Sequence, residues 1–250
     1  MEQMPNLKEV RGFDEQKTKG VSPWMLSLER ELGDQRPAAS WSYVIQDFTF
    51  EIIEGDQSLW IVARFPKGGE VALRAAYCSY NNITIHEMNA IDDGVENGLR
   101  NGLDIQLSSV TGQYHIRLAF LHLERALLRC TTTLTPAAPL FMPYFPRDVI
   151  PLGPADDLTH PEGVIYTQQI GPRSGMAYFS LARPRGGTVM YFQNLTALNE
   201  YAEQTKTSLQ EVVGGNWPEL GLSLPQAVEE PLEAGREIVL SDAFVLFNPF

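Results

Sequence analysis

The sequence predicts an all-β protein in which two large, mostly antiparallel sheets pack face to face as a sandwich, with one short helix. Apolar and polar residues alternate in many short runs, which is the period of a half-buried strand. Turns rich in Gly, Asn and Asp join these runs at short spacing, as in sandwiches. No helix of ordinary length interrupts the runs, which argues against a βαβ fold.

The alternating runs begin at Trp41 and continue to the end of the chain. We expect strands at 48–52, 59–65, 71–77, 83–85, 103–107, 114–120, 128–134, 164–166, 177–179, 188–192, 237–240 and 244–247. Residues 89–102 are rich in Asn, Asp and Gly and are expected to form a loop. Apolar residues recur at helical spacing over 195–205, directly after Asn194, a residue type that caps helix starts. The one short helix is therefore expected there.

The composition divides the chain into an arm and one large domain. Residues 1–40 are polar and interrupted by Gly and Pro, and we expect them to form an N-terminal arm that lies on the domain. Residues 41–250 are expected to form the β-sandwich domain. Within it, 135–160 is rich in proline, which cannot donate to a strand ladder. This stretch is expected to be an extended crossing segment that contains no central strand.

Charge and hydropathy exclude two classes of partner. The 250 residues carry a net charge of −12, which disfavours binding to phosphate backbones. No window reaches the roughly 18 apolar residues of a membrane span. The N-terminal residues contain no apolar signal-peptide core. We therefore expect no nucleic-acid partner, no membrane partner and a cytoplasmic location, or a secreted location if a signal peptide has been removed.

No complete catalytic constellation occurs in the sequence. The nucleophile elbow, the P-loop, the zinc-protease helix motif and the paired-cysteine motif are all absent. His115 and His122 are seven residues apart, which places them on opposite faces of a continuous strand and suits a metal poorly. We expect no metal and no cofactor, and we do not expect this chain alone to be catalytic. Cys78 and Cys130 are expected to be buried thiols, with a single bridge as the alternative.

One loop carries the chemistry of a sugar site. Trp217 lies between Asn216 and Pro218, and Glu219 follows closely. An aromatic ring stacks on the apolar face of a pyranose while amide and carboxylate groups bind its hydroxyls. The alternative is that Trp217 is a core anchor that fixes the loop to the sandwich, because large rings are usually buried.

Arg147 and Asp148 extend this candidate site. They lie in the proline-rich segment 135–160, close to Phe141, Tyr144 and Phe145. Such a segment is either a packed strap over the rim of the sandwich or one wall of a cleft. In the second case, Arg147 and Asp148 join Trp217 and its neighbours as carbohydrate-binding residues.

The second half of the chain resembles a known domain type. The resemblance rests on the order of Arg147-Asp148, Gly186-Gly187, the run 191–196 and the run 214–221, and it covers residues 135–245. This order is similar to the N-terminal β-supersandwich domain of multidomain glycoside hydrolases of the alpha-galactosidase-like and six-hairpin glycosidase families. In those enzymes the domain precedes a barrel-shaped catalytic domain. The resemblance implies a carbohydrate-active context, with the catalytic acid and base on the barrel.

The expected function is therefore that of a non-catalytic sandwich domain of a glycoside-hydrolase-like protein. It would pack on a catalytic domain of the same protein and help to form a carbohydrate cleft. The alternatives are a stand-alone carbohydrate-binding or carbohydrate-active sandwich and an assembly domain that self-associates without a ligand. An accessory domain is expected to expose an apolar patch, a binder an aromatic groove, and an assembly domain a two-fold contact surface.

Overall fold

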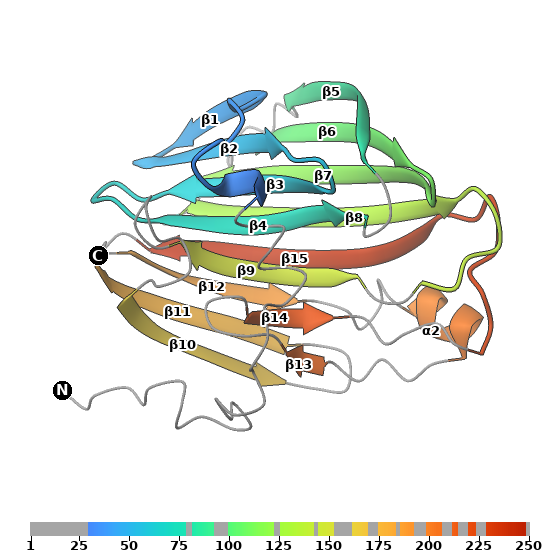
Figure 1. Cartoon of the computed structure of the whole chain (residues 1–250). Helices are drawn as coiled ribbons and strands as arrows, with labels where there is room; N and C mark the ends of the chain where they lie inside the picture. The colour runs from blue at the N-terminus through green and yellow to red at the C-terminus, as the bar shows by residue number, and fades with distance from the viewer. Residues whose placement is uncertain are drawn as a thin grey trace.

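The fold is a β-sandwich, as the sequence predicts, and Figure 1 shows its two stacked sheets. The computed structural model of the protein describes residues 30–78, 82–92, 100–122, 126–142, 145–152, 162–169, 175–183, 186–192, 199–206, 212–214, 220–223 and 229–248. The strand pairs formed by these residues are antiparallel. This pairing confirms the predicted architecture.

Seven strands form the first sheet, in the order β1-β2-β3-β4-β9-β14-β13. The first four are Trp41–Ile45 (β1), Phe48–Glu54 (β2), Ser58–Arg64 (β3) and Glu70–Tyr77 (β4). The other three are Pro146–Leu152 (β9), Leu220–Ser223 (β14) and Val212–Gly214 (β13). The sheet therefore joins a local meander of four strands to three strands from the second half of the chain.

Eight strands form the second sheet, in the order β10-β11-β12-β15-β8-β7-β6-β5. One half consists of Thr84–Asp92 (β5), Arg100–Ser109 (β6), Gly112–His122 (β7) and Ala126–Pro136 (β8). The other half consists of Glu162–Gln169 (β10), Gly175–Arg183 (β11) and Gly186–Phe192 (β12). Strand β15, Ile238–Asn248, pairs with both β8 and β12 and joins the two halves.

The core lies between the two sheets and is formed by the apolar members of each alternating run. Along β8, buried residues alternate with more exposed ones from Ala126 to Pro136, which is the predicted period of two. Aromatic rings connect the sheets at the centre. The ring centroid of Phe50 in β2 lies 5.1 Å from that of Phe120 and 5.0 Å from that of Phe247, both in the opposite sheet. Such contacts hold the two layers together.

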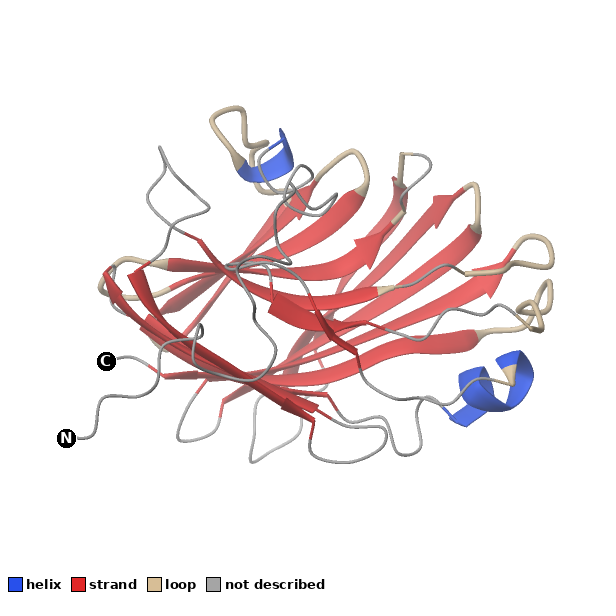
Figure 2. Cartoon of the chain, turned by 60° about the horizontal axis from the view of Figure 1, so that its bottom comes forward, coloured by secondary structure: helices blue, strands red, loops and turns tan. Residues whose placement is uncertain are grey.

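The predicted short helix is present as α2, Asn199–Thr205, at one end of the sandwich (Figure 2). Its Tyr201 is fully buried in the core, and burial raises the pKa of this phenol above its ordinary value. The helix covers 199–205 of the predicted range 195–205, and residues 195–198 and the expected cap at Asn194 lie outside the described residues. Among the described residues, no helix has the length and hydropathy that a membrane span requires.

The outer face of the seven-stranded sheet carries a second apolar cluster. It consists of Leu32, Ile53, Trp60, Val62, Ala72, Ile150 and Leu152. Leu32 belongs to the short segment 30–36 that precedes β1, so this segment packs on the sheet. Residues 1–29 of the predicted arm lie outside the described residues.

A buried carboxylate fixes this segment to the sheet. Glu31 is only 3% exposed, and it accepts hydrogen bonds of 2.7 Å from the indole Nε1 of Trp60 and from the backbone N–H of Gln57. A Cβ atom at Gly55 would collide with the Glu31 carboxyl group, so a larger residue at this position would force that carboxyl group to move. Arg36 adds an ion pair of 2.7 Å to Glu70 of β4.

The prediction that 135–160 contains no central strand is wrong. The segment does cross from one sheet to the other, but its second part is β9, which pairs with β4 on one side and β14 on the other. The prolines are tolerated because of their positions. Pro146 is the first residue of β9, and Pro151 pairs with Val71 of β4 beyond Val149, where the pairing with β14 stops.

The prediction of a loop over 89–102 is also wrong at both ends of this range. Strand β5 continues to Asp92 and β6 begins at Arg100, while 93–99 lies outside the described residues. The pairing of β5 with β6, and of β6 with the long strand β7, overrides the low strand propensity of Asn and Gly here.

Both cysteines are buried free thiols, which confirms the first of the two expected states. Cys130 lies in β8 on the core side of the sheet. Burial raises the pKa of its thiol to about 12, with a smaller contribution from the Asp242 carboxylate. A thiol in this state is protonated at neutral pH and unreactive.

Candidate functional sites

Two of the predicted sugar-site residues lie near an edge of the seven-stranded sheet. Arg147 and Asp148 are in β9, and their Cα partners in β14 are Leu222 and Gly221. The strand order continues from β14 to β13, which forms the edge of the sheet. Strand β9, which carries both residues, therefore lies directly beside the pair β14 and β13 that ends the sheet.

The other predicted residues, Asn216, Trp217 and Glu219, lie outside the described residues. The chain on either side of them is described. Gly214 ends β13 and Leu220 begins β14, and these two strands pair with each other. The sequence between the two paired strands thus contains the Trp217 motif, and the strand that follows it pairs with the strand of Arg147 and Asp148.

Two glycines lie beside Asp148 in the same register row. Gly221 is the Cα partner of Asp148 on one side and of Gly214 on the other. Glycines inside strands leave backbone uncovered and commonly mark places where a ligand approaches closely. Of the five predicted carbohydrate-binding residues, the structure describes the backbone of Arg147 and Asp148.

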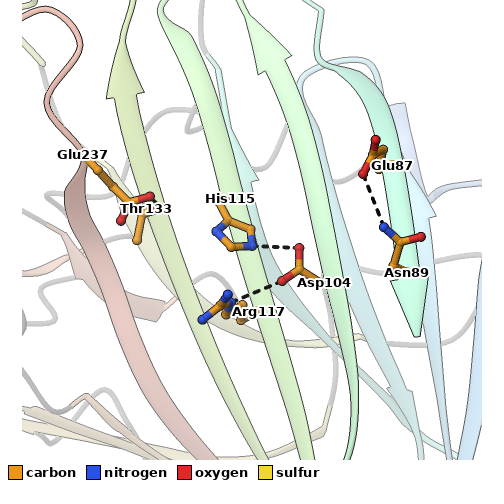
Figure 3. A network of polar contacts seen from close by, with 7 residues as sticks. All are labelled: Glu87, Asn89, Asp104, His115, Arg117, Thr133 and Glu237. Atoms are coloured by element: carbon orange, nitrogen blue, oxygen red, sulfur yellow. Dashed lines mark hydrogen bonds and ion pairs between the residues drawn. The ribbon is translucent and has the colours of Figure 1, made fainter. Parts of the chain in front are cut away.

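A second group of polar side chains lies on the outer face of the eight-stranded sheet (Figure 3). Asp104 of β6 is central to it. One carboxylate oxygen lies 2.7 Å from Nε2 of His115, and the other accepts a hydrogen bond of 3.2 Å from Nε of Arg117. The strand neighbours Ile105 and Ile116 are fully buried. The alternation of each strand therefore directs the polar side chains away from the core.

Further hydrogen bonds flank this group on both sides (Figure 3). On β5, the amide of Asn89 donates to Glu87 at 3.4 Å. On the other side, the hydroxyl of Thr133 in β8 donates to Glu237 at 3.2 Å. The polar surface thus extends from β5 to the start of β15.

A second acid–base pair lies on the same face, between β8 and β15. Arg129 donates to Asp242 through Nε at 3.0 Å and Nη2 at 2.8 Å, and the Thr131 hydroxyl donates to the same carboxylate at 3.3 Å. The hydrogen bond to Asp242 raises the pKa of Arg129 above its ordinary value. The guanidinium carbon also lies 5.2 Å from the ring centroid of Phe244.

The Asp104–His115 pair resembles the acid–base half of a catalytic triad, which also requires a nucleophile on the histidine. Within the described part of the chain, His115 hydrogen-bonds to Asp104 and to no hydroxyl or thiol. The described residues also contain no group of three or more His, Cys, Asp or Glu side chains arranged to hold a metal ion. The group therefore presents charged and hydrogen-bonding side chains on one face of the sheet.

The sequence interpretation missed Asp104, Arg117, Arg129 and Asp242. Strand alternation alone places Asp104 and Arg117 on outward positions, and this signal was available. It does not reveal which outward residues are neighbours, because that depends on strand register.

No protein-family model matches the chain, and no curated protein sequence matches it.

Proposed function

We propose that this chain is a non-catalytic β-sandwich domain of a glycoside-hydrolase-like protein. It packs on a catalytic domain and contributes one wall of a carbohydrate cleft. The main support is the register row Asp148–Gly221–Gly214. It connects the strand of Arg147 and Asp148 with the hairpin that carries the Trp217 motif, although these segments are far apart in the sequence.

The proposed ligand chemistry follows from the residue types at this edge. Trp217 offers an apolar ring for a pyranose face, and Asn216 and Glu219 offer groups for its hydroxyls. The size of the sandwich also supports the proposal, because the resemblance implies two large sheets and the chain has sheets of seven and eight strands.

The proposal is tested by titrating the chain with a panel of oligosaccharides while Trp fluorescence and thermal stability are measured. A domain that supplies one wall of a cleft is expected to bind weakly, with a Kd of about 1 mM. The fluorescence response of Trp217 is expected to disappear in Trp217→Ala and to weaken in Glu219→Gln. Glu233→Gln, at an exposed position near β15, is the control and is expected to bind like the unaltered chain.

The other outcomes identify the alternatives. A folded chain that responds to no sugar contradicts the cleft. A dimer without sugar binding, detected by sedimentation, favours the assembly domain. Binding with a Kd of about 1 μM indicates a stand-alone carbohydrate-binding protein.

A further inference from the structure

The outer face of the eight-stranded sheet presents a continuous polar row. Asp104, Arg117, Thr131 and Asp242 are successive Cα partners across β6, β7, β8 and β15. Neighbouring strands are about 4.8 Å apart, so the row spans roughly 14 Å. From this row we propose that the face binds a neutral oligosaccharide, at a site separate from the Trp217 edge.

The charges along the row are paired. Asp104 is bound by Arg117, and Asp242 is bound by Arg129. Each cation therefore has an anion beside it, and the row has no strong field of one sign. A nucleic acid is disfavoured further by the net charge of −12 on the chain. Paired charges of this kind suit a neutral ligand rich in hydroxyl groups.

The Arg129–Asp242 pair is held in one orientation by two hydrogen bonds. The side chain of Asp242 is only 7% exposed and that of Asp104 is 18% exposed, whereas those of Arg117 and Arg129 are 67% and 46% exposed. The carboxylates thus lie against the sheet and hold the guanidinium groups facing solvent. Because Arg129 also lies on the Phe244 ring, its guanidinium group is further restrained. Donors that are fixed before binding lose little entropy when a ligand arrives.

The surroundings supply additional hydrogen-bonding groups. His115, which binds Asp104, and Thr133, which binds Glu237, lie on the adjacent outward positions of β7 and β8. Gln106 is the exposed Cα partner of His115 in β6. A protein partner normally requires an apolar interface core. Polar groups on three adjacent strands instead match the hydroxyls of successive sugar rings.

The two proposed sites bind the same class of ligand but lie on different sheets. Either proposal can therefore be refuted while the other stands. Amide chemical-shift mapping on the unaltered chain distinguishes them. Linear neutral oligosaccharides of glucose, galactose, mannose and xylose are the probes. The proposal expects saturable shifts at residues 104–106, 115–117, 129–133 and 242–244. Shifts confined to β9 and β14 overturn it and leave the proposed cleft intact.

Substitutions then test the two guanidinium groups. Arg117→Gln and Arg129→Gln are each expected to weaken binding at this face by about tenfold or more, because each removes a charged donor. Arg64→Gln is the matched control, since Arg64 is 48% exposed and also paired with carboxylates, but on the other sheet. Trp217→Ala is expected to leave these shifts unchanged. Unchanged affinity in both Arg117→Gln and Arg129→Gln overturns the assignment.

Discussion

The two outer faces of the sandwich use similar side chains in opposite settings. On the seven-stranded sheet, Glu31 is buried with the indole of Trp60, and the guanidinium of Arg74 lies 4.5 Å from the same ring. On the eight-stranded sheet, Asp104 and Arg117 form their contact near solvent. A carboxylate contributes strongly to stability where water is excluded and weakly where it is not. The first face is therefore expected to stabilise the fold, while the second is available for binding.

Among the substitutions that test this comparison, Trp60→Ala is expected to cause the largest loss of stability. The ring is fully buried in the outer cluster of the seven-stranded sheet, so its removal leaves a cavity and takes away the indole donor of one Glu31 carboxylate oxygen. The expected loss is about 3–5 kcal/mol in the free energy of unfolding, measured by urea titration. Phe141→Ala is the control, because Phe141 is 53% exposed, and it is expected to change stability by less than about 0.5 kcal/mol. Similar losses in both variants would contradict a buried cluster on this face.

Glu31→Ala tests the buried carboxylate itself. The substitution removes the acceptor of two hydrogen bonds, from Trp60 and from the Gln57 backbone. Because a buried donor without a partner is costly, we expect a loss of about 1–3 kcal/mol in unfolding free energy. Glu233→Ala, at a side chain that is 66% exposed, provides the comparison and is expected to be nearly neutral. Equal urea midpoints for the two variants would argue against a stabilising role for Glu31.

Alkaline pH is expected to destabilise the protein through two titratable groups buried in the core between the two faces. Burial raises the pKa of Cys130 from 9.0 to about 12 and that of Tyr114 from 10.0 to about 12. The folded state therefore keeps protons that the unfolded state releases. Stability is nearly complete below about pH 9 and declines as the pH rises toward about 12, with a loss of about 2 kcal/mol at pH 10.

Urea unfolding at several pH values measures this decline. Cys130→Ala is expected to reduce its slope above about pH 9, because it removes the group that titrates first. Arg117→Gln, on the outer face of the same sheet, is expected to leave the slope unchanged. A stability that stays constant between about pH 8 and about pH 10 would show that the two groups are not buried as described.

The smallest effect is expected for the exposed ion pairs. Arg117→Gln and Arg64→Gln are each expected to change the unfolding free energy by less than about 0.5 kcal/mol. Arg64 belongs to the seven-stranded sheet but is half-exposed. Similar small effects in both variants would show that exposure, rather than the choice of sheet, sets the contribution. A loss of more than about 1 kcal/mol in either variant would contradict the view that exposed ion pairs contribute little to stability.

Most of the strands were predictable from the sequence, because alternation is a local signal, whereas β9, β13 and β14 were not expected. The runs around Phe50, Ile61 and Ile116 were expected as strands, and all three lie in strands with these side chains buried. The order of strands was not predictable. Strand β9 lies between β4 and β14, and β15 lies between β12 and β8, and each of these contacts joins distant parts of the chain.

Contacts between polar residues were likewise predictable only where they are local in the sequence. Asp104 and Arg117 are connected through one hairpin, and alternation places both on the outer face. Arg129 and Asp242 are separated by 113 residues, so no local pattern could have paired them. The Trp217 motif was proposed from its residue types alone, and the pairing of β9 with β14, the strand that follows the motif, was not predictable from the sequence.

The position of β15 in the eight-stranded sheet constrains the order in which the protein folds. Strands β5–β8 and β10–β12 precede it in the sequence, but they are connected in the sheet only through β15. During synthesis, the facing sides of β8 and β12 carry unpaired backbone groups until residues 238–248 have left the ribosome. Unpaired strand edges of this kind promote aggregation, and pairing over long sequence separations is slow. A nascent chain paused before Ile238 is therefore expected to be the form of this protein that depends most on chaperones.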